Sequence, residues 1–136
     1  MKNYYDQQKE LEIAKARLQT LKEQKKMYFE KTQPKSKKID GEMVSSSKIA
    51  NNVFLNYVEK TERIDIQIDI IKKEIALLEC YLKKMEYNLR SMKGILEKVF
   101  VDRYIDNMDV RKIANKHNYS ISNIYEILKK IKRIIR

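Results

Sequence analysis

Apolar residues recur at alternating spacings of three and four residues through most of the first 93 positions. Between residues 3 and 31, which contain no Gly or Pro, this seam consists of Tyr4, Leu11, Ala14, Leu18, Leu21 and Tyr28. Between residues 50 and 92 it consists of Ala50, Phe54, Tyr57, Thr61, Ile64, Ile68, Ile71, Ile75, Leu78, Leu82, Met85, Leu89 and Met92. Such spacing places apolar side chains along one stripe of a helix that packs against a partner helix. Over residues 1–93 the pattern predicts two helices that fold back on each other as an antiparallel helical hairpin, or coiled coil.

The stretch between these helices has the composition of a loop. Pro34, the pair Asp40-Gly41 and the run Ser45–Ser47 interrupt the seam, and such residues favour turns. We therefore expect a loop over residues 32–46, with Ser46 or Ser47 as the N-cap of the second helix.

A second apolar stripe runs beside the seam of the longer helix. It consists of Ile66, Ile70, Leu77 and Tyr81. One partner helix would leave this stripe in water, at a cost of about 25 cal/mol per Å² of apolar surface. We therefore expect self-association through the long helix, with a dimer favoured over larger assemblies. Coverage by the C-terminal domain or by another protein is the alternative.

The apolar period changes after Gly94, so a separate domain is predicted over residues 94–136. A short helix should end near Asn107, and Asp109 is a suitable N-cap for the next helix.

Residues 110–130 match the physical needs of a helix-turn-helix. Ile113 should face the core, and Ala114 is small enough for a second helix to cross closely. Asn118 tolerates the left-handed conformation of a sharp turn, and Ser120 can cap the second helix. The buried stripe of that helix should be Ile124, Ile127, Leu128 and Ile131.

Composition narrows the choice of partner. Two Gly, one Pro and 36% charged residues indicate an all-α protein, and a net charge of +11 favours an anionic partner. On charge, nucleic acid and an anionic membrane are the two options, and the helix-turn-helix with its run of Lys and Arg favours double-stranded DNA. The sequence has no apolar run long enough to span a membrane and no signal-peptide h-region, so we expect a cytoplasmic protein. A basic protein without such a partner remains an alternative on charge alone.

The second helix of the motif would enter the major groove of DNA. The candidates for base contacts are Ile121, Ser122, Tyr125 and Glu126. Ile121 could touch a thymine methyl group, and Glu126 could accept from cytosine N4. The candidates for phosphate contacts are Arg111, Lys112, Lys116, Ser120, Asn123, Lys129, Lys130, Lys132 and Arg133. Phosphate contacts of this kind set affinity and register, not sequence preference.

No residue pattern favours catalysis, so we expect no enzyme activity, no cofactor and no metal site. His117 is the only histidine and lies in the expected turn, where we interpret it as solvated or phosphate-facing. Cys80 is the only cysteine, and a small core residue is the simplest interpretation. There is no Cys/His cluster for zinc.

The stretch LEKVFVDRYIDNMDVRKIANKHNYSISNIYEILKKIKR, residues 96–133, resembles region 4 of sigma-70 family factors. The resemblance rests on the pair Arg103-Tyr104, the pair Ile113-Ala114 and the run Ser120–Tyr125. The whole chain is similar in layout to small prophage-encoded sigma-like regulators of low-GC Gram-positive bacteria, which have a loop resembling Ile39–Ser47. This resemblance implies activation of phage late genes and contact with RNA polymerase. No segment resembles the sigma region that melts promoter DNA, so a complete sigma factor is not expected.

Two alternatives stay open at this point. A DNA-packaging protein of the small-terminase kind, or an architectural DNA-binding oligomer, would also combine a helix-turn-helix with an oligomerising coiled coil. In the other alternative the coiled coil binds a host protein, and the DNA contact is secondary.

Overall fold

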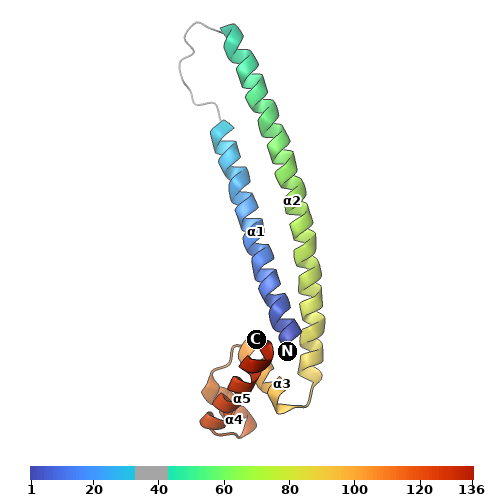
Figure 1. Cartoon of the computed structure of the whole chain (residues 1–136), viewed down its shortest axis with the longest axis vertical. Coiled ribbons are helices and arrows are strands. Elements are labelled where there is room, and N and C mark those ends of the chain that lie inside the picture. The colour runs from blue at the N-terminus through green and yellow to red at the C-terminus, as the bar shows by residue number, and fades with distance from the viewer. Residues whose placement is uncertain (33–42) are drawn as a thin grey trace. The chain divides into compact units, whose positions relative to one another are not determined.

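The computed structural model describes residues 1–32 and 43–136 of the chain, and side chains over residues 1–30 and 52–136. All regular structure in this part is helical, which confirms the predicted all-α class. The described residues form the helices labelled α1 to α5 in Figure 1 and a short π-helix, η1 (Val101–Ile105), which continues directly from α3. The α-helices are α1 (Lys2–Thr32), α2 (Met43–Ser91), α3 (Ile95–Phe100), α4 (Val110–His117) and α5 (Ile121–Ile135).

The helix α2 begins earlier than the sequence predicted. We expected a loop through residue 46, but the helix already includes residues from Met43, so that Ser46 and Ser47 lie inside it and neither is its N-cap. Serine costs only about 0.5 kcal/mol relative to alanine in a helix, so a run of serines is no firm barrier. The rest of the predicted loop, residues 33–42, lies outside the described residues.

The packing divides the chain into two compact units, described separately below. Residues 13–75 form the helix-pair unit, and residues 1–12 together with 76–136 form the C-terminal unit. The start of α1 and the end of α2 therefore belong to the same unit as the C-terminal helices. The sequence had instead predicted that all of residues 1–93 belong to the hairpin.

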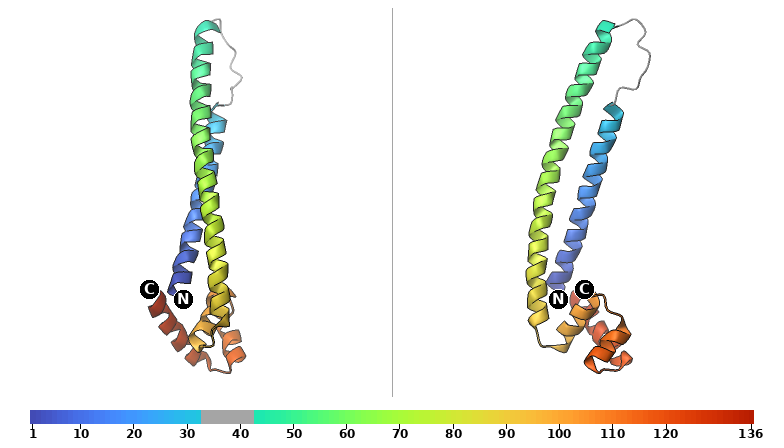
Figure 2. Two further views of the ribbon diagram at one scale, coloured as in Figure 1. Left: turned by 90° about the vertical axis from the view of Figure 1, so that its right-hand side faces the viewer. Right: turned by 180° about the vertical axis from the view of Figure 1, so that it is seen from behind.

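In the helix-pair unit, α1 and α2 run antiparallel and side by side (Figures 1 and 2). Lys25 Nζ lies 2.6 Å from Asp65 Oδ1, and Lys60 Nζ lies 5.3 Å from the ring centroid of Tyr28. Later residues of α1 therefore lie opposite earlier residues of α2, as an antiparallel pair requires. The seam faces the partner helix: Ala14, Thr61, Ile64 and Ile68 are buried, and Leu18, Leu21, Ile71 and Ile75 are half-buried.

Thr61 is a polar residue within this apolar seam. Its hydroxyl donates a hydrogen bond to the carbonyl oxygen of Tyr57 at 2.8 Å. Because the donor is satisfied within its own helix, threonine is tolerated where its neighbours along the seam are apolar.

The second stripe is exposed, as expected. Ile66, Ile70, Leu77 and Tyr81 are between 59% and 64% exposed in the chain as described. The seam and the second stripe therefore differ sharply in burial, although both are apolar. Pairing of α1 with α2 covers the seam and leaves the second stripe without cover.

Aromatic ring contacts and buried aliphatic side chains both contribute to the packing of the C-terminal unit. The ring centroids of Tyr4 and Phe100 are 6.0 Å apart in an edge-to-face arrangement, and Tyr5 meets Tyr104 edge-on at 6.2 Å. Phe100 also stacks on Tyr104 at 5.0 Å. The most deeply buried apolar side chains are Val99, Phe100, Ile113, Ile124 and Ile131, from α3, α4 and α5.

Candidate nucleic-acid interface

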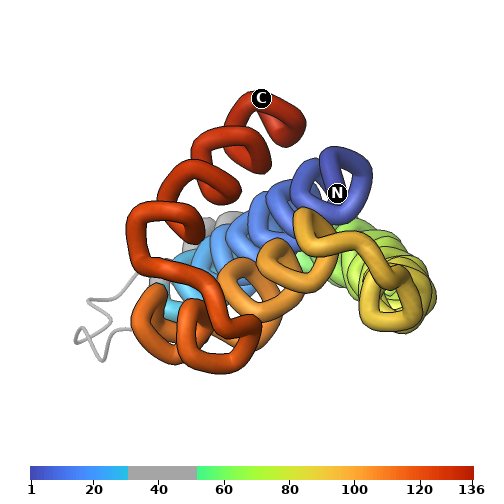
Figure 3. Tube along the Cα trace, turned by 90° about the horizontal axis from the view of Figure 1, so that it is seen from below, coloured from blue at the N-terminus to red at the C-terminus, as the bar shows by residue number. Residues whose placement is uncertain are grey.

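A tight turn joins α4 to α5 (Figure 3). Asn118 has φ 57° and ψ 38°, the left-handed conformation predicted for it. The N–H of Tyr119 donates to the carbonyl oxygen of Ala114 at 3.0 Å and closes the end of α4. The Ser120 hydroxyl accepts a hydrogen bond from the N–H of Asn123 at 3.2 Å, which confirms Ser120 as the N-cap of α5.

The start of α4 differs in one respect from the prediction. The helix begins directly after Asp109, as expected, but the Asp109 side chain makes no capping hydrogen bond. Asp109 is exposed. The Asp109 carboxylate therefore accepts no hydrogen bond from the first N–H groups of α4. Asp109 holds the N-cap position as predicted, but the prediction that its side chain caps the helix is wrong.

The helix α5 has one apolar face and one polar face. Its buried residues are Ile124, Leu128, Ile131 and Ile135, and Ile127 is half-buried. The exposed residues include Ile121, Ser122, Tyr125 and Glu126, the four candidates for base contacts. Ser122, Glu126, Lys129 and Arg133 follow one another at spacings of four, three and four residues, so they form one stripe opposite the core.

The basic candidates are also exposed. On α5 these are Lys129, Lys130, Lys132 and Arg133, and on α4 they are Arg111, Lys112 and Lys116. Within residues 123–136 the only acidic residue is Glu126. The exposed side of α5 therefore carries a concentrated positive charge beside its polar, base-reading candidates.

A groove of about 560 Å³ lies along one flank of α5. Its walls are formed by Arg103, Tyr104, Asn107, Val110, Tyr125, Leu128, Lys129 and Lys132. Tyr125 and Lys132 line this flank, and Lys129 belongs both to the groove and to the stripe through Glu126. The groove adds Arg103 to the cations predicted from the sequence. The Nη1 atom of Arg103 donates a hydrogen bond to the carbonyl oxygen of Met108 at 2.9 Å, and this bond holds the guanidinium in place.

Lys116 and His117, at the end of α4, both bind a buried carboxylate. Lys116 Nζ lies 2.7 Å from Asp102 Oδ1, and His117 Nε2 lies 2.6 Å from Asp102 Oδ2. Asp102 is only 2% exposed, whereas the Lys116 side chain is 50% exposed. The interpretation of His117 as solvated or phosphate-facing is therefore wrong, because its ring is mostly buried against Asp102.

Sequence reasoning missed Asp102. One signal was present in the sequence, because this carboxylate directly follows the apolar run Val99–Val101. Buried carboxylates need charged or hydrogen-bonding partners. Lys116 and His117 were two of several basic residues in this part of the sequence, so the sequence alone did not single them out as its partners.

A second polar contact holds the bend after η1. Arg90 Nη1 and Nη2 donate to the two carboxylate oxygens of Asp106 at 3.2 and 2.7 Å, and Nη2 also reaches Glu86 Oε1 at 2.9 Å. The hydrogen bonds from Arg90 lower the pKa of Asp106 from its usual value. Nearby, burial raises the pKa of Tyr104. These contacts fix the segment that precedes α4.

Comparison of the chain with protein-family models, with curated proteins and with solved structures finds no match. The resemblance to sigma region 4 stays a prediction. In the described part of the chain, no cluster of three or more His, Cys, Asp or Glu residues is arranged to hold a metal ion. No helix in the same part is both long and apolar enough to cross a membrane.

Proposed function

We propose that this protein is a sequence-specific DNA-binding transcription regulator, a sigma-like activator that positions RNA polymerase and catalyses no reaction itself. The observation that carries the proposal is the exposed side of α5. It presents four candidate base-reading side chains and a dense group of lysines and arginine, while the opposite side buries Ile124, Leu128, Ile131 and Ile135.

The geometry suits the chemistry of the major groove. The groove of B-DNA is about 12 Å wide and admits one α-helix. A helix held by its capping Ser120 and by a buried apolar face is rigid enough to present Glu126 to a cytosine amino group. Lys129, Lys130 and Arg133 lie one to two turns further along α5, where they can meet phosphates.

The remaining parts of the proposal rest on the resemblance. They are contact with RNA polymerase, a role in phage late transcription, and action in the bacterial cytoplasm. Because no segment resembles the region that melts promoter DNA, the protein would recruit or position polymerase and leave strand opening to another factor. We also propose that two copies associate through α2.

Fluorescence-anisotropy titration of the full chain tests DNA binding directly. Promoter fragments from its own prophage and random fragments of equal length would be compared at near-physiological salt. A preference of at least about 10³ for one site supports the proposal, since specific sites usually exceed random DNA by that much or more. Equal affinity for all fragments contradicts it.

A matched pair of variants separates a face-specific effect from loss of charge. Lys129→Ala/Lys130→Ala and Lys83→Ala/Lys84→Ala each remove two exposed, adjacent lysines from a helix. We expect the double variant on α5 to weaken DNA binding about tenfold or more and to reduce the slope of log affinity against log salt concentration by up to two. The double variant on α2 should change the affinity and the slope little. Equal effects of the two pairs would contradict binding by α5.

A further inference from the structure

We propose that the groove between α1 and α2 in the helix-pair unit is the seat for the exposed apolar face of α2 from a second copy of this chain. This inference concerns residues 13–75 alone, and it does not depend on DNA binding by α5.

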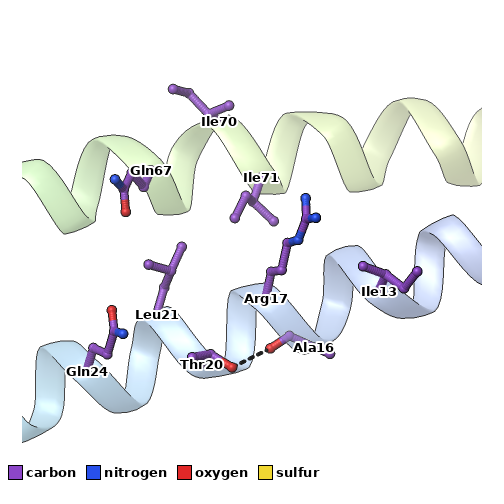
Figure 4. A pocket seen from close by; sticks show the side chains of 9 residues that line it. All are labelled: Ile13, Ala16, Arg17, Thr20, Leu21, Gln24, Gln67, Ile70 and Ile71. Carbon is purple, nitrogen blue, oxygen red and sulfur yellow. Dashed lines mark hydrogen bonds between the residues drawn. The ribbon is translucent and has the colours of Figure 1, made fainter.

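The groove has an accessible volume of about 520 Å³. Figure 4 shows Leu21 and Ile71 pointing into the space between the two helices, with Ile13 further along α1. Its lining is mostly apolar, and the charged residue among those lining it is Arg17. A concave apolar surface with one cation therefore lies open on the side of the helix pair.

The exposed face lies beside the groove on α2. It consists of Leu55, Ile66 and Ile70, which are 63%, 60% and 59% exposed. Their spacings of eleven and four residues correspond to about three turns and one turn, so the three side chains share one face of the helix. Ile70 belongs to both surfaces: it lines the groove, and in Figure 4 it points away from α1.

A convex apolar face beside a concave apolar groove is self-complementary. In a two-fold dimer the same patch occurs on both copies, so each copy places its exposed face in the groove of the other. Because Ile70 lies at the shared edge, one two-fold axis near it covers both grooves and both faces at once. A single unrelated helix would fill the groove and leave Ile66 in water.

Charge also favours a second copy. Glu62 and Asp69 lie four residues before and three residues after Ile66, so they flank it on α2. The contact of Lys25 with Asp65 places Arg17 opposite residues near Lys73, which is about one turn from Asp69 and about three turns from Glu62 in its own chain. A second copy that inserts Ile66 would bring a carboxylate to the rim that carries Arg17.

Sedimentation velocity of the full chain over a range of concentrations tests the interface. We expect a dimer, and we expect Ile66→Ser/Ile70→Ser to raise its dissociation constant at least about tenfold. The control is Tyr87→Ser, which removes a side chain that is 75% exposed on α2 in the C-terminal unit. Far-UV circular dichroism would check that the variants keep their helix content. A monomer at every concentration, a ring of many subunits, or an equal effect of Tyr87→Ser would overturn the proposal.

Cross-linking then tests which surfaces meet. In a Cys80→Ser background, a copy with Thr20→Cys in the groove is mixed with a differently tagged copy with Ile66→Cys. We expect a mixed disulfide dimer under mild oxidation, and much less with a Tyr87→Cys partner. Self-cross-linking of the Ile66→Cys copy in place of the mixed product would overturn groove binding, because the exposed faces would then meet each other.

Discussion

The Nε2 atom of His117 lies 2.6 Å from Oδ2 of Asp102, a carboxylate that is 2% exposed. The two atoms are within hydrogen-bonding distance, and an ionised carboxylate acts only as an acceptor. Lys116 Nζ takes the other oxygen of Asp102 at 2.7 Å. The end of α4 is thereby tied to η1 through one buried acid, and the turn that positions α5 starts from this anchor.

Removal of this acid should destabilise the C-terminal unit. Asp102→Ala leaves the ring of His117 without its acceptor, and we expect a loss of about 3 kcal/mol in the free energy of unfolding. Lys116→Ala should cost less, about 1 kcal/mol, because the Lys116 side chain is half-exposed and Asp102 keeps its contact with His117. Urea denaturation followed by circular dichroism measures both values. Equal losses would show that the carboxylate is not the centre of the contact.

The contact of Arg90 with Asp106 should appear in the response to acid. The pKa of Asp106 is lowered in the folded chain, so its pairing stabilises above the unfolded value of about 3.9 and is lost as pH falls through the lower folded value. The pair is partly exposed, so its contribution at neutral pH should stay at or below about 1 kcal/mol.

Asp106→Asn tests this assignment. We expect the variant to lose stability relative to the wild type at pH 6, and the difference to shrink as the pH falls below about 4. Thermal unfolding at several pH values gives the comparison. A difference that is constant down to pH 2 would mean that the carboxylate charge plays no part.

The sequence predicted local structure better than long-range contacts. The left-handed Asn118 and the capping Ser120 follow from the requirements of one turn, and the structure confirms both. The partners of Asp102 were not predicted, because fourteen and fifteen residues separate them from it and no periodicity links them. The ring contact of Tyr4 with Phe100 joins the start of α1 to the end of α3, and no local pattern encodes such a separation.

In the candidate DNA-binding site, too, exposure could be predicted from the sequence but contacts between distant residues could not. Helical periodicity alone separates the buried stripe of α5 from its exposed residues, so exposure of the candidates for base contacts could be foreseen. It could not show that the ammonium of Lys116 is held by Asp102, or that Arg103 joins Lys129 and Lys132 around a groove. Both facts depend on η1, whose π-helical turn leaves no signature in the apolar pattern.

The turn at Asn118 should respond to backbone geometry. With φ at 57°, Asn118→Gly should change the free energy of unfolding by only a few tenths of a kcal/mol, because glycine adopts this conformation without strain. Asn118→Val should cost about 1–2 kcal/mol, since a β-branched residue is strained there. Chemical denaturation compares the two, and equal stabilities would contradict a strained turn.

DNA binding by α5 predicts different behaviour for three exposed residues. Glu126→Ala should relax the preference at one base pair by about 1–3 kcal/mol, because the lost acceptor reads a base edge. Lys130→Ala should weaken all sequences alike and shallow the salt slope by about one. Lys116→Ala should change that slope less than Lys130→Ala, because Lys116 Nζ is already held by Asp102. Anisotropy titrations at several salt concentrations, with matched and single-base-substituted sites, measure all three. If Lys116→Ala shallows the slope as much as Lys130→Ala, its ammonium leaves Asp102 and reaches a phosphate in the complex.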